Sequence, residues 1–110
     1  MNHEKLICYQ KALQLAKNLH NEYQSFGLGY AYIKDQTKRA ISSVCLNLCE
    51  GNAKRSLKDR RRFFDIAKGS IAEVSACLDL MEAFGLISSS THQQYKSEAV
   101  EVIKMLYGLR

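Results

Sequence analysis

The side chains best suited to binding a ligand lie in one basic segment, from Lys54 to Lys68. This segment carries a charge of +5, which equals the formal net charge of the whole chain. Its basic residues are Lys54, Arg55, Lys58, Arg60, Arg61, Arg62 and Lys68. Because the positive charge is concentrated in one short stretch, an anionic partner is expected to bind there.

The three successive arginines of this segment cannot all face one ligand, because successive residues of a helix point in different directions. A broad exposed side is expected to carry Lys58, Arg61, Arg62 and Lys68. Arg60 instead lies on the inward stripe, three residues before Phe63. We therefore expect Arg60 to reach out of the end of the bundle or to pair with an acid.

Two interpretations of the basic segment remain open. The first is contact with nucleic acid, because the guanidinium group of arginine suits phosphate. Tyr30 and Tyr32 could then offer stacking surfaces nearby, although tyrosines at a loop are more often packed. The second is a solvated or salt-bridged face without a specific ligand, and Glu50 is placed to form such an exposed ion pair with Lys54.

The common catalytic signatures are absent from the chain. It contains no glycine-rich phosphate loop, no G-x-S-x-G, no H-E-x-x-H and no helix-borne Glu-x-x-His pair. We therefore expect no enzymatic activity, no catalytic residue and no cofactor. Four cysteines occur without a C-x-x-C pair, so they are expected to be reduced buried thiols and not metal ligands: Cys8, Cys45, Cys49 and Cys77.

The composition predicts an all-α protein. The chain has 110 residues, 46% apolar residues, no proline and six glycines, which permits long helices and lacks the turns of a β fold. This is the length of a single domain, residues 1–110, to whose stability oligomerisation would add. The chain has no long apolar run and no signal-peptide pattern, so a cytoplasmic protein that does not contact membranes is expected.

Apolar residues recur at spacings of three and four in segments that short loops separate. The stripe expected in a first helix, about residues 4 to 24, is Leu6, Tyr9, Leu13, Ala16, His20 and Tyr23. A second stripe, about residues 32 to 52, is Ile33, Thr37, Ala40, Val44, Asn47 or Leu48, and Gly51. The short loops favour an antiparallel, up-down-up-down four-helix bundle.

The third helix has the clearest end signals. Ser56 and Asp59 form a capping box, and Gly85 is expected to end the helix in a left-handed conformation. Its expected stripe is Phe63, Ala67, Ser70, Val74, Cys77, Met81 and Phe84, flanked by Phe64, Ile71 and Leu78. The last helix is expected to begin at a capping box in residues 90–93, and its stripe is Tyr95, Ala99, Val102, Leu106 and Leu109.

Polar and small residues on these stripes indicate how the helices pack. Asn47 points inward, so its amide should hydrogen-bond to a neighbouring helix and fix the register. A second face of the third helix is made of small residues, at which another element should approach closely. This face consists of Gly69, Ala72, Ala76 and Ala83.

One set of residues resembles a known family. The residues are Tyr9–Ala12, Gln36, Arg39-Ala40, Ser43, Asn47, Glu50-Gly51, Arg55, Phe63, Ile66-Ala67, Gly69-Ser70, Glu73, Leu78 and Leu86. They resemble the bacterial four-helix-bundle proteins encoded in intervening sequences of 23S rRNA genes. The fold is similar to the accessory variability protein of diversity-generating retroelements. The chain departs from the pattern at Arg60, where the family usually has an aromatic residue.

The resemblance implies a homopentameric ring of four-helix bundles without established enzymatic activity. It also implies binding of RNA or DNA and, in the retroelement relative, partnership with a reverse transcriptase. The predicted structural or interface residues are Asn47, Glu50, Gly51, Gly69, Ser70 and Glu73.

The leading hypothesis is a non-enzymatic, oligomeric protein that binds RNA or single-stranded DNA. It would serve rRNA processing or a retroelement reverse transcriptase. The alternative is a structural oligomer or a protein-interaction module, whose basic segment forms salt bridges between subunits or with a partner.

Overall fold

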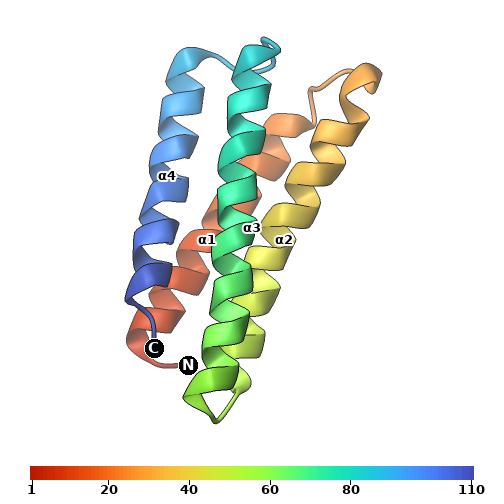
Figure 1. Ribbon diagram of the computed structural model, residues 1–110. Coiled ribbons are helices and arrows are strands. Elements are labelled where there is room, and N and C mark those ends of the chain that lie inside the picture. The colour runs from red at the N-terminus through yellow and green to blue at the C-terminus, as the bar shows by residue number, and fades with distance from the viewer.

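The absence of proline allows long helices, and the computed structural model, which describes residues 1–110, contains four of them. They are α1 (His3–Tyr23), α2 (Ala31–Ala53), α3 (Leu57–Ala83) and α4 (Ser89–Gly108), with a short 3-10 helix η1 (Leu28–Tyr30) before α2. Figure 1 shows that the helices run alternately up and down, so the predicted up-down-up-down bundle is confirmed. Both chain termini lie at the same end of the bundle as the α2–α3 turn (Figure 1).

Side-chain caps fix the helix starts. Asn2 accepts a hydrogen bond from the backbone N–H of Lys5 at 2.9 Å, and Ser56 accepts one from Asp59 at 3.1 Å, as predicted for α3. The cap expected for α4 in residues 90–93 was misplaced, because Ser88 accepts from the Thr91 N–H at 3.1 Å. Gly85 ends α3 with a φ of +73°, the left-handed conformation that the sequence predicts.

The predicted core stripe of α1 was wrong by one residue. The buried row is Lys5, Cys8, Ala12, Leu15, Leu19 and Tyr23. Leu6 and Leu13 are 40% and 38% exposed, and His20 is exposed, with its ring edge against Tyr23. Two apolar rows with helical spacing run side by side on α1, and the one that faces α2 and α4 becomes the core.

The helices α2 and α4 bury the expected faces, and the buried face of α3 is rotated from the expected one toward its flank row. In α2 the buried residues include Ile33, Thr37, Val44 and Leu48, and in α4 they are Tyr95, Ala99, Val102 and Leu106. In α3 the predicted stripe is buried at Ala67, Val74, Cys77 and Met81, and the flank row Phe64, Ile71 and Leu78 is buried with it. Phe63 and Ser70 lie at the edge of the buried face, and Phe84 is 43% exposed.

Each helix packs against its two neighbours in chain order, and α4 closes the bundle against α1. The α2–α3 pair makes the most extensive contact. Polar side chains tie α1 to α4, through Asn18 to Glu98 at 2.7 Å and Lys11 to Glu101 at 3.0 Å. The bundle measures 44 × 23 × 18 Å, and none of its helices has an apolar stretch that could cross a membrane.

Candidate nucleic-acid interface

The basic segment surrounds the α2–α3 turn at one end of the bundle (Figure 1). Lys54 has an extended backbone that ends α2, and its N–H donates to the carbonyl of Gly51 at 3.2 Å. Ser56 then caps the first turn of α3. Because the chain reverses within three residues, basic side chains from both helix ends lie close together at this end.

Arg60 holds the turn together. Its Nε donates to the carbonyl oxygen of Lys54 at 3.0 Å, and its Nη2 donates to that of Arg55 at 2.7 Å. Arg60 therefore reaches the end of the bundle, one of the two predicted outcomes, and there it binds backbone carbonyls and not an acid. Both carbonyls belong to the turn after α2, where they have no helical hydrogen-bond partner, which leaves them available as acceptors for a guanidinium group.

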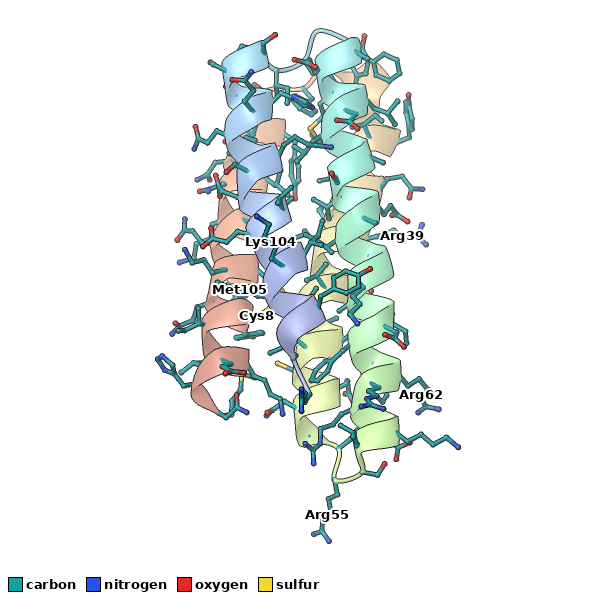
Figure 2. The ribbon with its side chains drawn as sticks, turned by 60° about the vertical axis from the view of Figure 1, so that its left-hand side comes forward. Cys8, Arg39, Arg55, Arg62, Lys104 and Met105 are labelled. Atoms are coloured by element: carbon teal, nitrogen blue, oxygen red, sulfur yellow. The ribbon has the colours of Figure 1, made fainter.

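Four cations at this end have no acidic partner within ion-pair distance. They are the exposed side chains of Arg55, Lys58, Arg61 and Arg62. Figure 2 shows Arg55 pointing away from the tip of the turn and Arg62 pointing outward from α3. Lys58, Arg61 and Arg62 line a shallow hollow together with Leu57, Asp59 and Asp65. The hollow is a positively charged surface that could hold phosphate groups.

Lys54 and Lys68 differ from these four, because each already has an acid beside it. Lys54 pairs with Glu50 at 3.7 Å, as predicted, and its ammonium lies 5.2 Å from the centre of the Phe63 ring. Lys68 pairs with Asp65 at 3.4 Å. The structure thus divides the seven predicted cations into four free ones, two paired lysines and Arg60, which is bound to the backbone.

The inward polar groups join α2 to α3 through hydroxyls. The Oγ atoms of Ser43 and Ser70 are 2.7 Å apart, which links the two helices. The Asn47 amide donates to the carbonyl and the Oγ of Ser43, at 2.8 and 3.1 Å. Asn47 was expected to bond directly to a neighbouring helix, and it instead orients the serine that does so, because its side chain reaches back along its own helix.

At Gly51 the backbone of α2 lies close against side chains of α3. A Cβ atom at this position would lie 2.6 Å from Cε1 of the Phe64 ring, which is buried. Such a distance is far inside van der Waals contact. Glycine is therefore required here so that the Phe64 ring can pack against the α2 backbone.

The small-residue face of α3 is open in the single chain. Gly69, Ala72 and Ala76 are exposed, and a Cβ atom on Gly69 would meet nothing within 4 Å. The expected close approach therefore does not come from another helix of the same bundle. Ile66 and Leu80, which are 45% and 42% exposed, flank this face, and Glu73 lies exposed within it.

The exposed aromatic residue beside the basic segment is not one that the sequence indicated. Tyr30 and Tyr32 lie at the start of α2, so a helix of 23 residues separates them from the α2–α3 turn. Tyr107 instead lies under the Lys68 ammonium, 4.5 Å from the ring centre. The sequence signal for Tyr107 is its position directly after Leu106, a residue of the core stripe of α4. Successive residues of a helix point in different directions, so the Tyr107 side chain lies off that stripe.

The cysteines are free thiols in the structure. Burial raises the pKa of Cys8 and of Cys45 to about 11, and it also raises the pKa of Cys77. These thiols are therefore protonated at neutral pH, the form that is a weak nucleophile.

Comparisons with known proteins identify relatives of this bundle. A crystal structure from Bacteroides thetaiotaomicron, described as a protein of unknown function from the S23 ribosomal protein family, superposes with a TM-score of 0.85. It is 20% identical, and the match covers 96% of each chain, so the likeness shows a shared fold. No curated protein sequence matches the chain.

The family comparison covers nearly all of the sequence. Residues 4–108, which include all four helices except the first residue of α1, match the family described as 23S rRNA-intervening sequence protein. The chain therefore belongs to the family of 23S rRNA-intervening sequence proteins.

Proposed function

We propose that this protein is a non-enzymatic, oligomeric nucleic-acid-binding protein whose α2–α3 end contacts the phosphate backbone of RNA or single-stranded DNA. The observation that carries the proposal is the group of four exposed cations without acidic partners, Arg55, Lys58, Arg61 and Arg62. The family's name, which refers to an intervening sequence of rRNA, supports RNA as the partner. In the cytoplasm of a bacterium, the protein would then assist rRNA processing or a retroelement reverse transcriptase.

The proposed contact is with phosphate and is therefore independent of base sequence. Guanidinium and ammonium groups that neutralise phosphates release bound counterions, so the affinity falls as salt concentration rises. If about four phosphates are neutralised on a single strand, log K should fall against log salt with a slope near −3. Titration of labelled RNA strands of two unrelated sequences at several salt concentrations tests this. Salt-independent binding, or the absence of binding at low salt, would refute the proposal.

We further propose that the open α3 face, defined by Gly69, Ala72 and Ala76, packs against another copy of the chain. Small side chains allow close approach of two helices, and the exposed Ile66 and Leu80 beside them would be buried in the contact. The resemblance to the family leads us to expect a pentameric ring, which would repeat the cations of the α2–α3 end around one rim.

Light scattering of wild type and of two Gly69 variants tests this assembly. Gly69→Leu should overpack the contact and weaken the oligomer by about 1–3 kcal/mol per contact, whereas Gly69→Ala should leave it intact. A wild-type protein that stays monomeric at micromolar concentration would contradict the proposal.

A structural or protein-interaction oligomer is the second candidate function. The observation that favours it is the presence of Asp59 and Asp65 in the same hollow as Arg61 and Arg62, because acids and bases on one surface can pair across a subunit contact. In that case, replacing both arginines with glutamate should break the oligomer into monomers.

A further inference from the structure

Tyr107 is an exposed aromatic residue that no packing role explains. It exposes 69% of its surface, more than any other tyrosine or phenylalanine of the protein. Its neighbours in the last turn of α4 supply the packing, since Leu106 is fully buried and Leu109 is half-buried. The Tyr107 ring therefore stands on the surface and is available to a ligand.

The ammonium group of Lys68 contacts the Tyr107 ring from one side. The Nζ atom of Lys68 lies 4.5 Å from the ring centre, and Asp65 binds the same ammonium at 3.4 Å. A cation over the face of a tyrosine is an attractive contact, so Lys68 fixes the orientation of the ring. Lys68 covers one face only, and the large exposed fraction leaves the other face open to solvent.

The Tyr107 ring lies on the same side of α3 as Arg61, one of the four free cations. Arg61 and Lys68 are seven residues apart on one helix, which places them on the same side with about 10 Å between their positions along the axis. Arg61 belongs to the hollow at the start of α3, and Lys68 contacts Tyr107. A strand whose phosphates bind in the hollow can therefore extend along this side of α3 to the Tyr107 ring.

We propose that Tyr107 is a base-stacking platform through which the α2–α3 end selects single-stranded nucleic acid over duplex. This inference rests on the proposed function, because the phosphate contacts must bring the strand to the ring. An unpaired base has a free π-face that can lie on the open face of tyrosine, whereas the bases of a duplex are already stacked on each other. The site would accept any base, because every base has such a face.

Three probes separate stacking from charge: a short mixed-sequence RNA strand, the same strand annealed to its complement, and an abasic strand of the same length. Fluorescence anisotropy should show that wild type binds the RNA strand more tightly than the duplex. Tyr107→Ala should reduce the affinity for the RNA strand ~5- to 150-fold and should leave the abasic strand and the duplex nearly unaffected. Tyr107→Phe should bind like wild type.

Tyr32→Ala is the matched control, because Tyr32 is 55% exposed at the opposite end of α2 and should not contribute. The inference is overturned if Tyr107→Ala binds the RNA strand as tightly as wild type, if the abasic strand loses as much affinity, or if Tyr107→Ala changes the oligomeric state. None of these results contradicts the proposed contact with phosphate. Failure of wild type to bind all three probes would overturn the proposed function as well.

Discussion

The two ends of the bundle use their charges differently. At the α2–α3 end, Arg55, Lys58, Arg61 and Arg62 have no acidic partner. Near the opposite end, charged groups tie α3 to α4. There Asp79 lies 2.8 Å from Nε2 of His92 and 3.0 Å from Nζ of Lys96. Lys96 also donates to the hydroxyl of Ser75 at 2.7 Å.

This difference shows that a cluster of cations without acidic partners, and not a single unpaired cation, marks a surface for an external anion, because the exposed Lys38 and Arg39 of α2 also have no acid within ion-pair distance. Between α3 and α4, His92 and Lys96 already lie beside the acid Asp79. The Ser43–Ser70 hydroxyl contact joins α2 and α3 near their middles, and Arg60 binds backbone carbonyls of the α2–α3 turn; neither contact uses an acid. The neighbouring cations are therefore left for a partner.

The largest expected effect comes from breaking the helix contact that supports the basic end. Gly51→Leu would drive a side chain into the buried Phe64 ring and should lower the free energy of unfolding by about 3 kcal/mol. Gly69→Ala is the control, because its Cβ meets nothing and removal of a mid-helix glycine should raise stability by up to about 1 kcal/mol. Urea denaturation measures both. Equal stability of Gly51→Leu and wild type would show that the ring can move aside.

A smaller effect on stability is expected from Arg60, the arginine of the α2–α3 end that is already hydrogen-bonded within the chain. Arg60→Met removes both hydrogen bonds to the turn carbonyls and should lower the free energy of unfolding by about 1 kcal/mol. Arg61→Met, on the same helix without such bonds, should change it by less than about 0.5 kcal/mol. The same denaturation experiment compares them. Two equal losses would contradict the structural role of Arg60.

The smallest effect on stability is expected near the opposite end of the bundle, where Asp79 lies beside His92 and Lys96. Hydrogen bonds from His92 and Lys96 hold the pKa of the Asp79 carboxyl below its ordinary value of 3.8. Because the folded pKa is the lower one, this carboxylate stabilises the protein above pH 3.8 and loses that effect as the pH falls through the folded pKa. Asp79→Asn should therefore cost about 0.5 kcal/mol at pH 7, and the cost should shrink in acid.

Thermal melts of Asp79→Asn and wild type, from pH 7 down to below pH 3.8, provide the measurement. The RNA affinity of the variant should equal that of wild type, because Asp79 lies about 30 Å along α3 from its first residue, well beyond the Debye length of about 10 Å. A gap in melting temperature that widens in acid would contradict the assigned pairing.

Much of the fold could be predicted from the sequence because its signals are local. The Ser56 cap, the left-handed Gly85 and the stripes of α2 and α4 each depend on neighbours within one or two turns. The core row of α1 could not be chosen, because Leu6 and Leu13 have the same helical spacing as the row that is buried. Only contact with α2 and α4 decides between the two rows.

The sequence identifies the candidate site as a basic segment, but it does not predict what each cation of that segment contacts. Counting charges identifies the basic stretch, but it cannot show that Arg60 meets the carbonyls of Lys54 and Arg55 across the turn. It also cannot show that Lys68 meets Tyr107, because these residues lie on different helices. Such contacts depend on how the helices pack, and spacing along the chain does not report them.

The central claim is that the unpaired cations of the α2–α3 end, and not the net charge as such, bind nucleic acid. The direct test is the RNA affinity of two charge-matched variants, Arg61→Glu with Arg62→Glu and Lys17→Glu with Lys38→Glu. Each pair lowers the formal net charge from +5 to +1, and all four residues are exposed. The arginine pair should abolish binding at moderate salt while the oligomer and its melting temperature remain, and the lysine pair should retain most of the affinity. Equal losses in both variants, or full binding by the arginine pair, would contradict the claim.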